Sequence, residues 1–502
     1  MSQLLPSLVE LEQHAEAQPA FATWRAGCGP LEHTLETQAA VFRLAHQLVQ
    51  AGLQPDLASV YRLLQALDHV TCAGLWLVVH MTYAQQVHLD GTPLAAEDFK
   101  RTPEGHTGGA LNMVPAYAGY LALNALTGHT RGWLMGQGHC VAAIDALNLL
   151  TGNLHAEQAQ AYGGGETGIN RMLQDFYGYR QASDGSPLAP LGSHVNPHTA
   201  GGIAEGGYLG FAELQYAHMP LPGETLVAFL SDGAAEEQRG SDWMPRWWRA
   251  EDCGAALPVM IANGRRIEQR TALATDEGLV GFRQHLSHCG FDPIPFDGRD
   301  PAAFVATLWE MEQRLARRVE EKERGILNYP LPIPYGIAET IKGFGFYGAG
   351  SNAAHNLPLP GNPRLDIESR ELFNRHAAEL FVPQEQLNAA LTLFTQHRRG
   401  RPLERDNALA LRRPAAPVIP RLHYRDDACS PMSAVDRFFV ELTQANAGLR
   451  PRVGNPDELA SNRLGGVLKA LKHRVIDPES ELEAIDGNII TGLNEDAVVS
   501  GG

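Results

Sequence analysis

A carboxylate and a carboxamide each follow an apolar segment of this sequence. Asp232 and Gly233 come shortly after the run from Thr225 to Leu230, and Asn263 follows the run from Leu257 to Ala262. Oxygen ligands of these two kinds suit Mg²⁺, whose octahedron is usually completed by phosphates and water. Gly233 would let the backbone approach phosphate oxygens, and the amides that begin a following helix would face the same negative charge. When the residues are considered alone, two ordinary turns are the more common explanation.

Four histidines occur in glycine-rich or turn sequences, and their side chains suit proton transfer. They are His106, His139, His194 and His355. An imidazole has a pKa near neutrality, so it can both donate and accept protons. A single histidine of this kind more often has a structural role. The four contexts together favour one shared site.

The elements that must position these groups are short strands alternating with helices. Between about residues 71 and 263, short apolar runs that end in glycine and a polar residue alternate with helix-like stretches, which is typical of an α/β fold. The clearest strands are predicted at Gly132 to Met135, Thr225 to Leu230 and Leu257 to Ala262. The carboxyl ends of parallel strands meet at one edge of a sheet, where open α/β sheets bind ligands. Asp232 and Asn263 are therefore expected to lie close together.

The rest of the chain divides at a segment rich in arginine and proline. Helices are predicted at 304–324, 365–397 and 435–447, while 398–425 combines eight arginines with four prolines, as extended connections do. We expect a first domain at 1–397 with a helical N-terminal extension, a linker at 398–432, and a second α/β domain at 433–502. About 70 residues form only a thin domain, so this last one is expected to be incomplete.

Composition narrows the class of protein. The 502 residues carry a net charge of −17, which disfavours nucleic-acid binding because phosphate backbones need clustered Lys and Arg. No run approaches the roughly 18 apolar residues of a membrane span, and the N-terminus, with three glutamates, is predicted to form an amphipathic helix. The six cysteines form no CxxC pair, which argues against a disulfide framework and a structural zinc site. We expect a cytoplasmic protein without membrane or nucleic-acid partners.

The motifs, taken in order, resemble those of phosphoketolases, which split xylulose 5-phosphate or fructose 6-phosphate with inorganic phosphate to give acetyl phosphate. The matching segments are Gly105-His106, Gly136-Gln137-Gly138-His139, Ser193-His194 followed by Glu205-Gly206-Gly207, Asp232-Gly233, His355, and Asn455-Pro456-Asp457-Glu458 with Ser461-Asn462-Arg463. The resemblance covers about residues 95 to 500. It implies a thiamine-diphosphate-binding fold, with a diphosphate-binding domain at 1–397 and the start of a pyrimidine-binding domain at 433–502.

The resemblance also implies a role for each site residue. Asp232, Asn263 and the main-chain carbonyl of Arg265 would hold Mg²⁺, and Gly207 and Gly233 would contact thiamine diphosphate. His106, His139, His194 and His355 would surround its reactive carbon and the substrate hydroxyls, and Glu495 would be the catalytic glutamate. Ser461 and Arg463 would bind the substrate phosphate, since a guanidinium fork fits that anion.

Several positions depart from the family pattern. Thr107 stands where the family has tryptophan, Cys140 and Val141 replace two glycines, and Ala234 replaces the glutamate of Gly-Asp-Gly-Glu. Lys342 is a candidate for the lysine of the family's Gly-Trp-Thr-Gly-Pro-Lys segment. These changes leave three enzymatic outcomes open, a phosphoketolase, a transketolase or an epimerase, beside a non-catalytic relative that kept the fold.

The C-terminal part implies a partner. A complete phosphoketolase continues through the rest of the pyrimidine-binding domain and a further domain, whereas only seven residues follow Glu495. The sequence therefore predicts a split enzyme, an oligomer in which a separate subunit supplies the remainder, and a truncated gene is the alternative.

Overall fold

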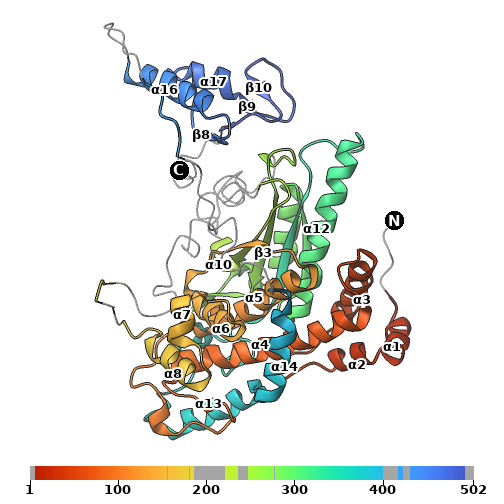
Figure 1. Cartoon of the computed structure of the whole chain (residues 1–502), viewed down its shortest axis with the longest axis vertical. Helices are drawn as coiled ribbons and strands as arrows, with labels where there is room; N and C mark the ends of the chain where they lie inside the picture. Colours follow the sequence, from red (N-terminus) through yellow and green to blue (C-terminus); the bar gives the residue numbers. More distant parts are fainter. Residues whose placement is uncertain are drawn as a thin grey trace.

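A five-stranded parallel sheet forms the centre of the fold (Figure 1). The structure, a computed structural model, describes residues 6–154, 156–179, 181, 183–185, 221–235, 247–275, 277–398, 416–421 and 430–491. The strands run in the order β1-β2-β3-β7-β6. Their bounds are β1 Gly132–Met135, β2 Thr225–Ser231, β3 Ala255–Ala262, β6 Phe291–Asp297 and β7 Ile333–Glu339.

The three predicted strands are confirmed, and two further strands were not predicted. β1 has the predicted bounds, β2 extends one residue further to Ser231, and β3 begins two residues earlier at Ala255. β6 has the sequence FDPIPFD and β7 the sequence IPYGIAE. Proline weakens a strand pattern because it cannot donate a hydrogen bond, and β6 with its two prolines occupies the sheet edge, where such residues are tolerated.

Helices cover both faces of this sheet, which explains why its strands are apolar almost throughout. Along β2, Val227 and Phe229 contribute to the apolar cluster that contains α4, α5 and α12 residues. Leu226, Ala228 and Leu230 contribute to a second cluster on the other face, together with residues of α11. Successive side chains of a strand point to opposite faces, so a strand that is covered on both sides shows no apolar and polar alternation.

The helices of this first part form the layers around the sheet. Their bounds are α1 Leu8–Ala17, α2 Pro19–Arg25, α3 Leu35–Gln50, α4 Leu57–Tyr83, α5 Thr107–Thr127, α6 Val141–Thr151, α7 Ala156–Tyr162, α8 Glu166–Asp175, α10 Asp232–Ala235, α11 Gly278–His288, α12 Pro301–Glu323, α13 Ile367–Leu380 and α14 Gln384–Thr395. The helices predicted near the N-terminus and at 304–324 and 365–397 are therefore present. A short antiparallel pair, β4 Arg265–Arg266 and β5 Gln269–Arg270, follows β3.

α4 is the central core helix. By length and composition alone it could cross a membrane, but 83% of its apolar window is buried inside the protein. It packs against α2, α5, α6 and α14. Its apolar surface is thus used by the fold itself.

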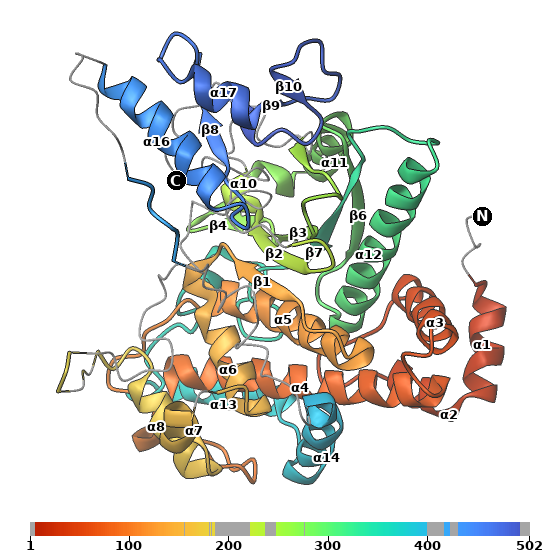
Figure 2. The ribbon, with the colours of Figure 1, turned by 45° about the horizontal axis from the view of Figure 1, so that its top comes forward.

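A second, smaller parallel sheet lies in the C-terminal segment, residues 430–491, which is coloured blue in Figures 1 and 2. Its strand order is β10-β9-β11-β8, and α16 and α17 accompany it. The bounds are α16 Pro431–Ala445, β8 Val453–Asn455, α17 Gly465–Leu471, β9 His473–Arg474, β10 Glu483–Ala484 and β11 Ile489–Thr491. The strands have two or three residues each, and the described residues place only a small apolar cluster beneath them. The predicted second α/β unit is therefore present in outline.

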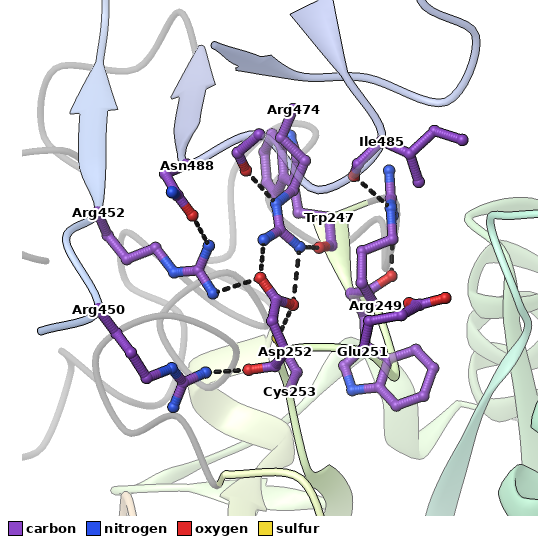
Figure 3. A network of polar contacts seen from close by, with 12 residues as sticks. Trp247, Arg249, Glu251, Asp252, Cys253, Arg450, Arg452, Arg474, Ile485 and Asn488 are labelled. Carbon is purple, nitrogen blue, oxygen red and sulfur yellow. Dashed lines mark hydrogen bonds and ion pairs between the residues drawn. The ribbon is translucent and has the colours of Figure 1, made fainter. Parts of the chain in front are cut away.

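The C-terminal segment docks beside the residues that precede β3, at the amino edge of the large sheet (Figure 3). The Asp252 carboxylate binds the guanidinium groups of Arg452, at 2.7 Å, and Arg474. In the opposite direction, buried Arg249 donates from Nε to the carbonyl of Ile485 at 2.9 Å and from a terminal nitrogen to that of Val475 at 3.1 Å. We refer to these six residues as the docking network. In both ribbon views the segment lies beyond one end of the strands, whereas α6 lies toward the other (Figures 1 and 2).

Candidate active site

A cavity of about 490 Å³ opens at the carboxyl edge of the large sheet. Its walls come from the segments that follow β1, β2, β3 and β7 and from the start of α5. The lining residues include Gly109, Met113, Gln137, His139, Cys140, Asp232, Gly233, Asn263, Arg265, Lys342 and His355. This is the edge at which parallel α/β sheets bind ligands. The cavity therefore opens at the edge of the sheet where the sequence predicted polar residues.

Asp232 follows β2 and is almost fully buried, with 2% of its surface exposed. One carboxylate oxygen accepts a hydrogen bond from its neighbour Gly233 at 2.9 Å, and the other accepts one from the amide of Gly264 at 2.7 Å. Gly264 has φ +75°, a left-handed conformation that favours glycine. The turn after β3 is thus fixed to the end of β2, and the two predicted ligand positions lie side by side.

Asn263 is oriented by a residue that the sequence analysis did not find. Its Oδ1 accepts from the amide of Arg265 at 3.0 Å, and its Nδ2 donates to Oδ1 of Asn112 at 3.2 Å. Asn112 lies on α5 and donates to the carbonyl of Ile341 at 2.7 Å. Asn112 is one of two carboxamides within the apolar sequence of α5, and this was the available signal, because a buried polar side chain needs a partner. Asn112 thereby joins three walls of the cavity.

The side chain of Arg265 turns toward the loop after β7. Its Nε donates to the carbonyl of Gly350 at 2.6 Å, and a terminal nitrogen donates to Asn352 Oδ1 at 2.5 Å. The guanidinium group of Arg265 is thus hydrogen-bonded to residues of the loop after β7.

Three of the four predicted histidines lie together. The ring centroids of His106 and His139 are 5.2 Å apart, those of His106 and His355 are 5.3 Å apart, and those of His139 and His355 are 5.8 Å apart. All three rings are partly exposed, so they can reach a bound molecule. Residues separated by up to 249 positions in the chain therefore form one imidazole cluster.

Two glycines at the start of α5 allow this cluster to form. A Cβ at Gly108 would lie 2.1 Å from the carbonyl oxygen of Ala354, and one at Gly109 would lie 2.6 Å from Cys140 Sγ and 3.0 Å from His139 Nε2. The loop that carries His355 is also held directly, because the Thr107 hydroxyl donates to the carbonyl of Asn356 at 2.5 Å. The Gly108-Gly109 pair is thus a steric requirement of the site.

Lys342 contacts His355, and both are electrostatically perturbed. Lys342 is 2% exposed, and its Nζ lies 2.8 Å from His355 Nδ1. Burial lowers the pKa of Lys342, although the charge of Asp232 acts against this. Burial, followed by the charges of Lys342 and His106, lowers the pKa of His355 to about 4. His355 is therefore a neutral imidazole at physiological pH, which accepts a hydrogen bond from the lysine through Nδ1.

The remaining predicted site residues are not among the described residues that line this cavity. His194, Gly207 and Glu495 lie outside the described residues. Ser461 and Arg463 are exposed on the turn before α17 and do not line the cavity, because their segment docks at the other edge of the sheet. The predicted phosphate contacts are therefore not joined to the imidazole cluster within this chain.

The described residues contain no group of three histidine, cysteine, aspartate or glutamate side chains that could hold a metal ion. Within that part of the chain, Asp232 is the one acidic residue on the cavity wall. A cation here would consequently need the Asn263 amide, a main-chain carbonyl and oxygens of its own ligand. This donor set suits Mg²⁺ better than zinc, which prefers nitrogen and sulfur.

Comparison with solved structures shows the class of fold. A transketolase from Campylobacter jejuni superimposes with a TM-score of 0.51 at 15% identity, covering 87% of this chain and 62% of that one. The chain thus has the α/β fold of transketolase, a thiamine-diphosphate-binding fold.

Family models and sequence relatives then identify the family. The model of the XFP N-terminal domain matches residues 60–395, and the model of D-xylulose 5-phosphate/D-fructose 6-phosphate phosphoketolase matches residues 433–501. This chain belongs to the phosphoketolase family, as its motifs indicated. A probable phosphoketolase of Pseudomonas putida is 28% identical over 81% of this chain and 54% of its own length, and one of Rhodopseudomonas palustris is 28% identical over 84% and 56%. The chain spans just over half the length of these relatives.

Proposed function

We propose that this chain takes part in the thiamine-diphosphate-dependent cleavage of a ketose phosphate, as a phosphoketolase-like lyase. The observation that carries the proposal is the joint position of Asp232, Asn263, His139 and His355 around one cavity of about 490 Å³, with His106 packed against both imidazoles. Binding of a diphosphate requires a cation and backbone groups close to the phosphate oxygens, and reaction of a sugar requires side chains that exchange protons with it. The residues of the cavity can provide the cation ligands, the backbone groups and the proton-exchanging side chains.

The residues at the ends of β2 and β3 fit a magnesium diphosphate. Each carboxylate oxygen of Asp232 accepts one backbone N–H, and this carboxylate would be the charged ligand of the cation. Asn263 Oδ1 and the carbonyl of Arg265 would complete the protein ligands, and Gly233 would face the phosphate oxygens. Mg²⁺ would take its remaining positions from diphosphate and water.

The imidazole cluster and Lys342 would take part in proton transfer to and from the substrate. When bound, thiamine diphosphate supplies the nucleophilic carbon that opens the bond between C2 and C3 of a ketose. His355 is neutral, and because its Nδ1 accepts from Lys342, its Nε2 carries the hydrogen and can donate to a substrate oxygen, while His106 and His139 lie beside it. Lys342, in the role of the family's lysine, would orient His355 and stabilise negative charge on a substrate oxygen.

Completion of the site requires polypeptide other than the described residues. The C-terminal segment docks at the amino edge of the sheet, and a strand rises about 3.3 Å per residue, so the eight residues of β3 separate it from the cavity by roughly 25 Å. We propose that Ser461 and Arg463 bind the substrate phosphate in the cavity of a second copy. A pyrimidine-binding domain, including the acid expected at Glu495, would close the cofactor site.

Cofactor binding is the first test. Calorimetric titration of the protein with thiamine diphosphate, in buffer with Mg²⁺ and then with chelator, should show saturable binding that depends on the cation. An absence of binding in every condition, including in the presence of any co-purified partner, would contradict the proposal and favour a non-catalytic relative.

Product analysis then separates the possible reactions. Incubation with xylulose 5-phosphate and inorganic phosphate should yield acetyl phosphate, and the yield should fall to background without phosphate. Transfer of two carbons to an added aldose would instead define a transketolase, and recovery of an epimeric ketose would define an epimerase.

The expected second subunit and the cytoplasmic location are parts of this proposal that need tests of their own. Purification of a tagged chain from the native host, followed by mass spectrometry of the soluble fraction, should recover an oligomer. A stoichiometric second polypeptide that carries the rest of a pyrimidine-binding domain would support a split enzyme, whereas recovery of copies of this chain alone would overturn it.

A further inference from the structure

The turn between α2 and α3 brings two cysteines together. Cys28 lies in the turn at Gly27–Leu31, and Cys72 lies on α4. The Cys72 thiol donates to the carbonyl of Cys28 at 3.2 Å, and the two thiols interact electrostatically. They are 44 positions apart, which no spacing rule would have paired.

The backbone of the turn packs directly onto the Cys72 sulfur. Gly29 has φ +52°, and a Cβ at this position would lie 3.3 Å from Cys72 Sγ and 2.7 Å from the carbonyl oxygen of Glu379. The turn therefore cannot move away from α4 without losing contacts on both sides. The two sulfurs are held close in the folded protein.

The environments of the two thiols differ in a way that suits oxidation. Cys28 is partly exposed, whereas Cys72 is fully buried in a small apolar cluster with Leu31, Val382 and Leu387. The hydrogen bond from Cys72 lowers the pKa of Cys28, although burial and the charge of Asp68 oppose it. The same hydrogen bond, with burial, raises the pKa of Cys72. Cys28 is thus the thiol that an oxidant reaches, and it is also the better nucleophile.

We propose that Cys28 and Cys72 form a redox-active dithiol that a peroxide converts to a disulfide. The Cys28 sulfur attacks one peroxide oxygen, the O–O bond breaks, and the products are a sulfenic acid and water or an alcohol. The Cys72 sulfur then displaces the hydroxyl from the Cys28 sulfur, and the thiol proton leaves with it as a second water. Two thiols are oxidised and one peroxide is reduced.

The position of the pair gives the oxidation a structural consequence. Pro30, in the same turn, approaches Gly345, where an added Cβ would lie 3.7 Å from Pro30 Cγ. Phe344 packs against the cluster that contains Cys72. Gly345 and Phe344 belong to the loop that carries Lys342 and His355 into the cavity. A disulfide would therefore fix the turn on which this loop rests.

The test uses the whole protein and does not depend on its activity. The reduced protein is exposed to hydrogen peroxide, its free thiols are alkylated, and it is digested with trypsin without reduction. Cys28 falls in the peptide 26–43 and Cys72 in the peptide 63–100, so a disulfide joins these two peptides. The expected result is the joined pair, two hydrogen atoms lighter than the sum of its peptides, with two of the six thiols protected and recovered by dithiothreitol.

Matched variants make the result specific. Cys28→Ser should abolish the joined peptide, whereas Cys289→Ser, which changes another partly exposed cysteine, should leave its yield unchanged. Peroxide treatment that drives Cys28 to a sulfinic acid while Cys72 stays alkylatable would overturn the proposal. So would a joined peptide that links either cysteine to a different partner. Because the wild-type readout requires no variant to fold and no cofactor to bind, its failure would leave the proposed function untouched.

Discussion

Asp232 is a carboxylate buried in the cavity wall. Its two oxygens accept hydrogen bonds from the backbone amides of Gly233 and Gly264. Burial of a carboxylate is costly unless charge and hydrogen bonds compensate for it. A bound cation would provide that compensation, so the arrangement is consistent with a metal ligand that the backbone has oriented in advance.

Replacement of Asp232 by alanine should therefore abolish cation-dependent cofactor binding. We expect the affinity for thiamine diphosphate with Mg²⁺ to fall by at least about 100-fold, since a ligand of the cation is lost. Calorimetry measures the change. Glu320→Gln on the exposed side of α12 is the control and should bind like the wild type. Equal affinity in Asp232→Ala would remove Asp232 from the site.

Gly108 offers a steric test of the same site. Gly108→Ala would place a methyl group 2.1 Å from the carbonyl oxygen of Ala354, so the loop that carries His355 must shift. We expect a loss of about 1–3 kcal/mol in unfolding free energy, measured in urea. Gly281→Ala on α11 is the matched control, because nothing lies within 4 Å of its added Cβ. The control should gain up to about 1 kcal/mol from helix propensity. Equal effects of the two substitutions would refute the steric argument.

At the scale of elements, a buried ionic cluster joins three helices away from the cavity. His33, just before α3, contacts Asp300 at the start of α12 through Nδ1 at 2.8 Å, and Asp68 on α4 through Nε2 at 3.1 Å. All three side chains are essentially inaccessible to solvent, and Trp24 stacks on the imidazole with centroids 4.2 Å apart. The relative positions of α3, α4 and α12 thus depend on one imidazolium.

This cluster makes stability depend on pH. Burial alone would lower the pKa of His33, but the hydrogen bonds and charges of Asp300 and Asp68 outweigh it and raise the pKa to about 10. The folded protein therefore holds the proton more tightly than the unfolded chain, whose histidine titrates near about pH 6.5. The stabilisation is complete below that pH and is lost as the pH rises toward 10.

We accordingly expect unfolding free energy to fall by about 1–3 kcal/mol between about pH 7 and about pH 9.5. His33→Gln should be less stable than the wild type at the lower pH, and its unfolding free energy should fall by less as the pH is raised. Urea unfolding at both pH values measures this, with exposed His46→Gln as the control that keeps the wild-type slope. An unchanged slope in His33→Gln would exclude His33 as its origin.

At the scale of the whole molecule, the docking network decides where the C-terminal segment lies. Burial would raise the pKa of Asp252, but Arg474 and Arg452 outweigh it and hold that pKa at about 2. Arg474 is fully buried and also donates to the carbonyls of Gly487 and Trp247. Removal of one charge from such a network leaves the other uncompensated, which costs more than the pair itself contributes.

Asp252→Asn should therefore loosen the segment from the large sheet. We expect a cost of about 2 kcal/mol in docking, which corresponds to roughly 30-fold faster hydrogen exchange for backbone amides of β9 and β11. Mass-spectrometric exchange measures it, and cofactor binding provides a second readout of whether docking affects the cavity. Asp297→Asn, which removes an ion pair with Arg299 only two residues away, should leave exchange in the segment unchanged. Wild-type exchange in Asp252→Asn would show that the network does not hold the segment.

The sequence alone determined the local parts of this protein. Runs such as Thr225 to Leu230 predicted strands, because short apolar runs of that length are typical of buried strands. The polar residues at the ends of these runs predicted a ligand-binding site at one edge of the sheet. Those predictions placed Asp232 beside Asn263 without any knowledge of the packing. β6 and β7 escaped detection because their prolines hide the strand pattern.

Only the tertiary structure decided which distant residues meet. The contact of Lys342 with His355, the support of Asn263 by Asn112 and the pairing of Cys28 with Cys72 all depend on how α4, α5 and the loop after β7 pack. The same holds for Ser461 and Arg463, which their motif placed near the cofactor but which docking leaves at the opposite edge. The local sequence pattern predicts the secondary structure of a segment. Contacts between segments depend on how their apolar surfaces are buried against one another, and a motif does not encode this packing.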